Sequence, residues 1–517
     1  MESRRLDLTD TVPGQDILAA AKGGGISFVG RLFEYTTRFA FSIIVARTIG
    51  AEQFGLYTLG VTVTEITSMI ALLGLQTGMV RFIPIALRQR DEGRVWGIIQ
   101  VGATIPALLS LLLFGTIFLS ADPIAAQVFH ESRLAPVLRL VCLAIPLDAL
   151  NFVAFSVIQS FKQLKYSVLA NQIVAPLAKL ALTIGLLVIG LGTLGIVAAH
   201  VAASAIGLAL LIYFANRLFP LNRPLRAGKR NTGELLRFSL PAHMAWVINA
   251  VRGSLETMVL GFMGLTTGVG VYTAALRLSA VGNMFYFSIA SISAPIITDL
   301  YSRGESVRLE QLYQTTTKWL ITFNFPLFLT FVIFAVPLIS IFGADFAAGA
   351  TGLIILASGT LVNTGTGVGA TVIDMTGHTR LNFGNSVFLM ITAVSLDLLL
   401  IPRWGVIGAA IASALPTFLV NLLCLLEVFV LLRILPYNWS IFKPIIAGLV
   451  AAGITYLVSQ RLTLLPLGQL AVGATILWGV YALVITLLGF SEEDRLVLNG
   501  VRARLNLDKL LNWRFVQ

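Results

Sequence analysis

The most informative residues of this sequence are charged side chains inside long apolar stretches. Arg31, Glu34 and Arg38 stand at positions i, i+3 and i+7 of one stretch, and a helix places such positions on one face. Arg252 and Glu256 lie together in a second stretch. A charged side chain at the centre of a bilayer costs roughly 2.5–3.5 kcal/mol on insertion scales. We therefore expect these residues to bind a ligand, an ion or one another.

Basic residues at similar predicted depth favour a site for an anion. Arg38 and Arg252 are 214 residues apart, which matches the offset of an internal repeat of the chain. Two further basic residues lie about 15–20 Å into their segments by helical rise. A guanidinium group binds a phosphate through two parallel hydrogen bonds. The predicted substrate-binding residues of a cationic cavity are Arg31, Arg38, Lys179, Arg252 and Arg277.

Acidic residues at comparable depth have two interpretations, and the sequence leaves both open. In the first, they bind a coupling proton or cation; the candidates are Glu34, Glu65, Asp148 and Glu256. In the second, they form structural ion pairs, for which Arg31–Glu34 and Arg252–Glu256 have the helical spacing. His200 and His243 are interpreted as hydrogen-bonded polar groups rather than ligands.

The sequence lacks the motifs of several enzyme classes. There is no GxxxxGK[ST] phosphate-binding loop and no HExxH pair among the four histidines. The two cysteines, Cys142 and Cys424, both lie in apolar runs, which excludes a cysteine-rich metal site. No outer loop is long enough to hold a glycosyltransferase or ligase site. We predict no catalytic residue, no metal site, no cofactor and no enzymatic activity.

The composition predicts an integral membrane protein. Of 517 residues, 57% are hydrophobic and only 12% are charged, about half the charged share of a soluble protein. The net charge of +11 comes from short loops between apolar segments, so it indicates membrane orientation rather than nucleic-acid binding. The loops on the side of the two termini hold most of this charge. Both termini are therefore expected in the cytoplasm, with the chain in the plasma (inner) membrane.

Stretches of roughly 20 apolar residues, long enough to cross a bilayer, recur along the chain. This pattern predicts an all-α fold of about fourteen transmembrane helices. We place them near 25–47, 54–77, 96–119, 135–160, 166–190, 193–216, 238–263, 268–294, 317–341, 349–375, 382–401, 405–432, 441–459 and 466–489.

An internal repeat divides most of the chain into two halves. IGAEQFGLY (49–57) aligns with MGLTTGVGVY (263–272), and GTLGIVAAHV (192–201) aligns with GVIGAAIASA (405–414). The offset stays at 213–215 residues, which predicts two pseudo-symmetric six-helix lobes around a central cavity. The expected parts are an N-terminal lobe (1–225), a C-terminal lobe (226–436), two appended helices (437–490) and a cytoplasmic amphipathic tail (491–517).

Three segments together resemble a known family. They are SFVGRLFEYTTRFAFSIIVARTIGAEQFGLYTLG, then LLGLQTGMVRFIPIALRQRDEGRVWG, and LLIPRWGVIGAAIASALPTFLVNLL (399–423). In this order they resemble the polysaccharide-transport (Wzx-type) flippases of the multidrug/oligosaccharidyl-lipid/polysaccharide exporter superfamily. The resemblance covers the first twelve predicted helices.

The resemblance implies a flippase that moves a polyprenyl-pyrophosphate-linked oligosaccharide from the cytoplasmic to the outer leaflet by alternating access. The basic residues of the predicted cavity would meet the pyrophosphate. Membrane lipid, the lipid-linked glycan, and a polysaccharide polymerase and glycosyltransferases of the same pathway are the implied partners. The alternative is a cation-coupled multidrug or small-molecule exporter of the same superfamily, with Glu34 and Glu256 as coupling residues.

Overall fold

The computed structural model describes residues 13–229, 232–461, 465–489 and 494. Within these residues every regular element is helical, as the sequence predicts. The chain divides into two compact units, Met1–Gly270 and Val271–Gln517. The lobe boundary at 225/226 is predicted from the repeat. The two compact units divide at a different point, between Gly270 and Val271.

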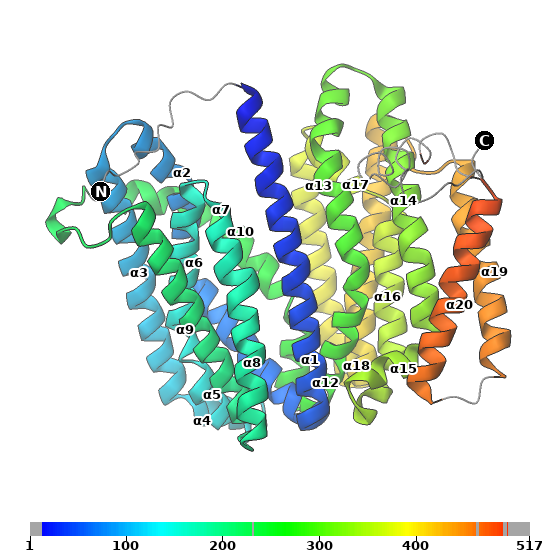
Figure 1. Cartoon of the computed structure of the whole chain (residues 1–517), viewed down its shortest axis with the longest axis horizontal. Helices are drawn as coiled ribbons and strands as arrows, with labels where there is room; N and C mark the ends of the chain where they lie inside the picture. Colours follow the sequence, from blue (N-terminus) through cyan, green and yellow to red (C-terminus); the bar gives the residue numbers. More distant parts are fainter. Residues whose placement is uncertain (1–12, 230–231, 462–464, 490–493, 495–517) are drawn as a thin grey trace, which may run out of the picture. The chain divides into compact units, whose positions relative to one another are not determined.

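The first unit consists of helices that run side by side, with α6 in contact with both α3 and α9, and α8 in contact with α9 (Figure 1). Its helices are α1 (Pro13–Ala71), α2 (Leu75–Arg88), α3 (Glu92–Leu119), α4 (Ala121–Pro123), α5 (Leu134–Val141), α6 (Ala144–Ser160), α7 (Leu164–Ser167), α8 (Ala175–Val188), α9 (Gly192–Leu218), α10 (Thr232–Arg252), α11 (Leu255–Phe262) and the start of α12 (Thr266–Ser279). Two π-helical segments, Ile124–Val128 and Val168–Val174, and a 3₁₀ turn, Leu225–Ala227, complete it.

The second unit continues α12 and adds helices that pack mainly on α14 and α16. They are α13 (Val281–Ser302), α14 (Ser306–Ile333), α15 (Ala335–Ile339), α16 (Ala350–Gly365), α17 (Gly369–Met375), α18 (Thr379–Leu432), α19 (Phe442–Ser459) and α20 (Pro466–Leu487), with 3₁₀ turns at Ser340–Phe342, Ala344–Gly349 and Trp439–Ile441. The two appended helices, α19 and α20, form a hairpin that packs on α14.

Eleven helical segments of the described chain are long and apolar enough to cross a membrane. The two longest are each divided by a glycine with non-helical dihedral angles, Gly50 in α1 and Gly405 in α18. The seventh predicted span is split into α10 and α11. Fourteen spans are therefore consistent with the structure. The predicted segment 54–77 is interrupted at residues 72–74, where α1 ends and α2 begins.

The predicted repeat is present in the backbone. Left-handed residues, which usually mark the ends of helices, recur at the same offset of 213–215 residues in both halves. The pairs are Gly50 and Gly264, Arg90 and Gly304, His130 and Gly343, Lys162 and Gly377, and Gly192 and Gly405. In three pairs the first member is not glycine, although a left-handed residue with a side chain is uncommon. The two halves therefore share the positions of their turns more closely than their residue types.

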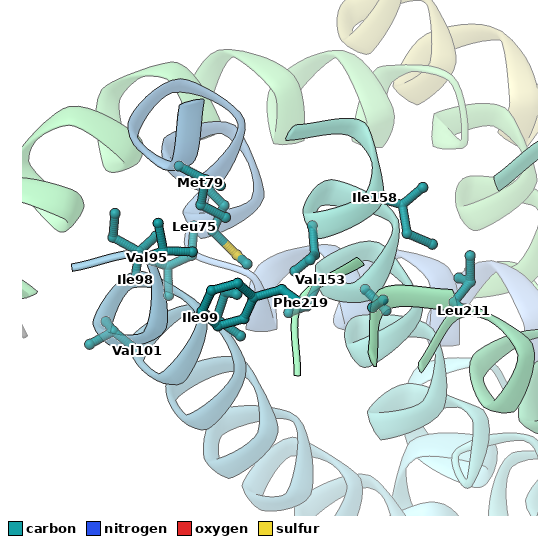
Figure 2. Packing of buried hydrophobic residues seen from close by; sticks show 14 of the residues in the cluster. Leu75, Met79, Val95, Ile98, Ile99, Val101, Val153, Ile158, Leu211 and Phe219 are labelled. Atoms are coloured by element: carbon teal, nitrogen blue, oxygen red, sulfur yellow. The ribbon is translucent and has the colours of Figure 1, made fainter. Parts of the chain in front are cut away.

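An apolar core of the first unit lies between α2, α3, α6 and α9. Figure 2 shows its side chains meeting from these helices, with the labelled members Leu75, Met79, Val95, Ile98, Ile99, Val101, Val153, Ile158, Leu211 and Phe219. Leu235 of α10 belongs to the same core. Close packing without voids holds these helices at fixed positions.

Helix α10 packs tightly on α2 because two glycines allow close approach. A Cβ added at Gly78 would lie 2.3 Å from Ser239 Oγ, and one at Gly74 would lie 2.4 Å from the Ser239 carbonyl oxygen. The rings of Phe82 and Phe238 meet edge to face nearby. The first helix of the second sequence half therefore packs as part of the first compact unit.

The predicted tail lies largely outside the described residues. Asp494 is described, and its carboxylate lies 2.7 Å from the Lys318 ammonium of α14. The indole of Trp319 also donates a hydrogen bond to it. The side chain of Lys318 is 7% exposed, so this ion pair is shielded from solvent and joins the start of the tail to α14.

Candidate functional site

The first unit contains a cavity of about 490 Å³. It lies between α1, α6, α8 and α9 and the π-helical segment Val168–Val174. Its volume is in the range of small-molecule and cofactor sites. The charged and titratable side chains that line it are Glu34, Arg38, Glu65, Asp148, Lys179 and His200.

Five of the nine residues predicted from the sequence line this cavity. They are Arg38, Lys179, Glu34, Glu65 and Asp148. The other four lie elsewhere. Arg31 is exposed on α1, and Arg277 lies on the part of α12 that belongs to the second unit. Arg252 ends α10, and Glu256 is buried at the start of α11.

Arg38 forms an ion pair with Glu34 across one turn of α1. The guanidinium lies 2.8 Å from the carboxylate, and the exposed fractions are 68% for the Arg38 side chain and 21% for that of Glu34. The predicted pair Arg31–Glu34 is therefore replaced by Arg38–Glu34. The i, i+4 spacing with the acid first is the favourable arrangement on a helix, which accounts for the preference.

The helix on which Arg252 and Glu256 were predicted to share a face is interrupted between them. Arg252 is the last residue of α10, and α11 begins only at Leu255, so the helix is broken between the two side chains. Gly253 favours this break because glycine is a poor helix former. The Nε of Arg252 is buried and has no hydrogen-bond partner among the described residues.

Lys179 of α8 contacts an imidazole and two aromatic rings. Its ammonium lies 2.8 Å from His200 Nδ1, 4.6 Å from the centre of the Phe41 ring and 5.6 Å from that of Tyr57. An ammonium group can only donate, so Nδ1 accepts and the imidazole is neutral with its proton on Nε2. That Nε2 is buried without a partner among the described residues, which corrects the interpretation of His200 as a fully hydrogen-bonded group.

Asp148 lies on α6, opposite the α9 wall of the cavity. Its carboxylate accepts a hydrogen bond from the Ser204 hydroxyl of α9, and the charges of Glu65, Lys179 and Arg38 act on it. Three carboxylates and two cations thus share the described part of the cavity lining. The site is mixed in charge rather than purely cationic.

Several lining residues were not singled out from the sequence. They include Ser204 and Gly207 on α9, Asn151 on α6 and Asn171 in the π-helical segment, whereas His200 was named only as a hydrogen-bonded polar group. A helical signal was present, because Asp148 and Asn151 are three residues apart, and His200, Ser204 and Gly207 follow at i, i+4 and i+7. Uncharged polar residues in apolar stretches are common, however, and this spacing alone does not distinguish a cavity from a packed helix interface.

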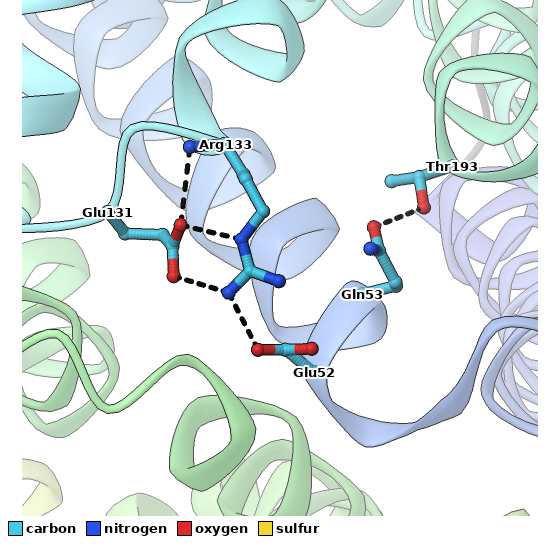
Figure 3. A network of polar contacts seen from close by, with 5 residues as sticks. All are labelled: Glu52, Gln53, Glu131, Arg133 and Thr193. Atoms are coloured by element: carbon cyan, nitrogen blue, oxygen red, sulfur yellow. Dashed lines mark hydrogen bonds and ion pairs between the residues drawn. The ribbon is translucent and has the colours of Figure 1, made fainter.

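A second polar network joins Glu131 and Arg133, which lie outside the candidate membrane spans, to residues of α1, and Figure 3 shows it with the neighbouring pair Gln53 and Thr193. The Arg133 guanidinium donates to Glu131 at 2.8 Å and to Glu52 at 2.7 Å. The bonds from Arg133 lower the pKa of Glu131, and both carboxylates raise the pKa of Arg133. Beside it, Thr193 donates to Gln53 at 2.8 Å. These contacts join the start of α9 and the residues before α5 to the second half of α1.

The family model described as "Polysaccharide biosynthesis protein" matches residues 20–301, more than half of the chain. A protein of Haloferax volcanii named "Probable low-salt glycan biosynthesis flippase Agl15" is 24% identical over 404 residues, covering 76% of this chain and 80% of that protein. The "Succinoglycan biosynthesis transport protein ExoT" of Rhizobium meliloti is 26% identical over 288 residues, 54% of this chain and 53% of that protein.

Solved structures with the same fold include "Lipid II flippase MurJ, inward closed conformation". The TM-score is 0.71 at 14% sequence identity, and the match covers 90% of this chain and 98% of that one. A multidrug resistance MATE family transporter of the MOP superfamily in its inward-facing conformation matches with a TM-score of 0.63 at 16% identity, over 77% of this chain and 94% of that one. The predicted transporter fold is therefore confirmed.

Proposed function

Because the chain belongs to the polysaccharide biosynthesis protein family, we propose that it is a flippase for a polyprenyl-pyrophosphate-linked oligosaccharide. It moves this lipid from the cytoplasmic to the outer leaflet by alternating access, and it acts as a transporter rather than an enzyme. The names of the two relatives, a glycan biosynthesis flippase and a succinoglycan transport protein, support this function. The product is used for cell-surface polysaccharide.

The cavity of the first unit is the observation that supports this proposal most directly. It places charged side chains inside a membrane-spanning helical unit, where each would be costly without a ligand or a partner. A flippase needs such a polar space because the head group of its lipid must cross the apolar part of the bilayer.

Arg38 is the first candidate for contact with the pyrophosphate. It lines the cavity and its side chain is largely exposed, so a phosphate can reach the guanidinium without displacing a buried group. Arg31, Lys179, Arg252 and Arg277 are the further candidates of the same proposal. Binding of a coupling proton or cation is assigned to the acidic set, Glu34, Glu65, Asp148 and Glu256.

The cellular setting follows from the same function. We place the protein in the plasma (inner) membrane with both termini in the cytoplasm, since the basic loops are expected on that side. A polysaccharide polymerase and glycosyltransferases of the pathway would make and use the transported lipid. These enzymes are proposed as functional partners.

The test is glycan display by cells whose own copy is replaced by an Arg38→Ala, Arg252→Ala double variant. Display should be abolished while the variant still reaches the membrane, because the guanidinium contacts to the pyrophosphate are lost. Arg303→Ala is the matched control, since Arg303 is an exposed arginine paired with Asp299 at the end of α13. Wild-type display by the double variant would refute the assignment.

A cation-coupled small-molecule exporter is the second candidate function. The carboxylates of the cavity and the fold shared with a multidrug transporter favour it. Deletion of the gene separates the two candidates: loss of surface glycan with unchanged drug resistance supports the flippase, and the reverse result supports the exporter.

A further inference from the structure

Both cations of the cavity are already engaged by protein groups. Arg38 is bound by the Glu34 carboxylate at 2.8 Å, and Lys179 donates to His200 from between the Phe41 and Tyr57 rings. Three carboxylates line the same space. Like charges at close range oppose each other strongly in a medium of low dielectric constant. A pyrophosphate deep in this cavity would therefore meet more repulsion than attraction.

The end of the cavity beside Gly207 instead presents hydrogen-bond acceptors. A Cβ added at Gly207 would lie 3.6 Å from Asn151 Oδ1 and also 3.6 Å from Asn171 Oδ1. The two amide oxygens thus converge on the space that the missing side chain leaves open. They come from two different elements, α6 and the π-helical segment Val168–Val174, and π-helical turns are frequent at functional sites.

One of these oxygens lacks a partner. The Asn151 amide nitrogen donates to the Ser204 carbonyl oxygen at 3.1 Å, which orients the side chain. Its Oδ1 is buried and accepts no hydrogen bond within the described residues. A buried acceptor without a donor costs about 1–3 kcal/mol, so a ligand that donates to it gains this free energy. The Asp148 carboxylate lies three residues earlier on α6 and adds further acceptor capacity.

We infer that this end of the cavity is a glycan subsite, defined by Gly207, Asn151, Asn171 and Asp148, which accepts hydrogen bonds from sugar hydroxyls. Phosphate oxygens are acceptors at neutral pH and cannot satisfy these groups, whereas a hydroxyl donates. The inference rests on the proposed function and deepens it: the glycan enters the cavity, and the pyrophosphate stays at Arg38, whose side chain is exposed.

Aromatic side chains complete the subsite. Phe152 and Phe155 line the cavity from α6, and their rings offer apolar faces to the C–H groups of a sugar. Trp246 of α10 packs on Phe152 at a ring distance of 5.8 Å and an interplanar angle of 79°, which holds that ring in place. A few oriented polar groups within an apolar lining are typical of small-ligand sites.

Gly207→Ala tests the subsite with little risk to folding. The added methyl would enter the space between the two amide oxygens, while its nearest contact is Ala175 Cβ at an ordinary 3.4 Å. Gly185→Ala is the matched control, because a Cβ on that α8 glycine meets nothing within 4 Å. Asn151→Leu is the second variant, since it removes one acceptor oxygen and retains the side-chain volume.

The probes are the lipid-linked oligosaccharide extracted from cells that lack the protein, and a polyprenyl diphosphate of the same chain length without sugar. Binding is measured on the purified full-length protein in nanodiscs. We expect the wild type and Gly185→Ala to bind the glycosylated lipid roughly tenfold more tightly than the bare lipid. Gly207→Ala and Asn151→Leu should abolish this ratio without weakening binding of the bare lipid.

Each outcome separates the subsite from the proposed function. Equal wild-type affinity for the two lipids, or equal weakening of both by Gly207→Ala, would overturn the glycan subsite and leave the flippase standing. Failure of the wild type to bind either lipid would contradict the flippase itself. If Gly207→Ala changes only how transport depends on the cation of the added salt, the subsite binds a cation instead of a glycan.

Discussion

At the level of single residues, Lys179 is held by His200, Phe41 and Tyr57. Its ammonium donates to a neutral imidazole and lies over two aromatic faces, and these contacts stabilise its charge. Glu34, Glu65 and Asp148 line the same cavity. Removal of this charge changes the electrostatic balance of the whole site.

Lys179→Met should reduce transport of the lipid-linked glycan at least roughly tenfold while the protein remains folded. The substitution keeps the length of the side chain but removes a positive charge, so that Arg38 remains to balance the three carboxylates of the lining. It also removes the donor to His200. Glycan display and membrane abundance are measured together. Lys165→Met, at an exposed lysine over Tyr166, is the control. Normal display by Lys179→Met would show that its charge is dispensable.

At the level of elements, the connection between α9 and α10 is fastened to the start of α3. We call residues 219–229 the linker. The Trp96 indole donates to the Pro224 carbonyl oxygen at 3.0 Å, and the Lys229 amide donates to Gly93 at 2.9 Å. Ion pairs join Arg223 to Glu92 and Lys229 to Asp91 at 2.9 and 3.0 Å. The linker is therefore a packed part of the first unit.

Gly97→Ala should destabilise this contact. A Cβ at Gly97 would lie 2.1 Å from the Lys229 carbonyl oxygen, so α3 and the linker must separate, at a cost of about 1–3 kcal/mol. Gly115→Ala in the same helix is the matched control, since nothing lies within 4 Å of its Cβ. Thermal unfolding of the purified protein measures both. Gly97→Ala with the stability of Gly115→Ala would mean that the linker is not fastened there.

The fastening of the linker should weaken at low pH. The Lys229 ammonium and the Arg94 amide bind the Asp91 carboxylate and lower its pKa below the ordinary 3.8. A lowered carboxylate pKa contributes stability that is present above the unfolded value and is lost as the pH falls through the folded value.

Asp91→Asn tests this dependence. The melting temperature of Asp91→Asn should lie below that of the wild type at pH 7. The difference between the two proteins should shrink only as the pH falls below 3.8 towards the lowered folded pKa, where the wild-type carboxylate takes up its proton. Melting temperatures between pH 7 and 3 are compared. A constant difference across this range would exclude the Asp91 carboxylate as the cause.

At the level of the whole molecule, the compact unit Met1–Gly270 includes α10 and α11 in addition to the helices of the first sequence half. Helix α10 is held to α2 by the contact of Gly78 with Ser239 and by Leu235 in the shared core. At the far end, the Phe262 carbonyl oxygen lies 3.0 Å from His130 Nδ1. We expect α10 and α11 to move together with the first unit during transport.

A disulfide between Gly78→Cys and Ser239→Cys tests this expectation in a Cys142→Ala, Cys424→Ala background. A Cβ added at Gly78 would lie 2.3 Å from Ser239 Oγ, so the two positions adjoin, and α2 and α10 must move slightly apart to reach the Cβ–Cβ separation of roughly 3.5–4.5 Å in a disulfide. The oxidised protein should retain transport activity, since the bond joins parts of one rigid unit. Activity that is lost on oxidation and restored by a reductant would show that α2 and α10 separate. The two single-cysteine variants control for oxidation.

The sequence by itself determined the features that depend on local pattern. Apolar length specifies the spans, and the repeat offset of 213–215 residues recurs in the positive-φ turns, such as Gly50 with Gly264. The charged positions Arg38, Lys179 and Asp148 were also identifiable, because a charge in an apolar stretch is conspicuous.

Only the tertiary structure decided which of these residues meet. Lys179 contacts His200, and the oxygens of Asn151 and Asn171 converge beside Gly207, because separate helices bring them together. It also grouped α10 with the helices of the first half of the chain in one compact unit. Helical periodicity states which side of a helix a residue occupies. The neighbour on that side depends on packing between distant segments, and no local pattern records it.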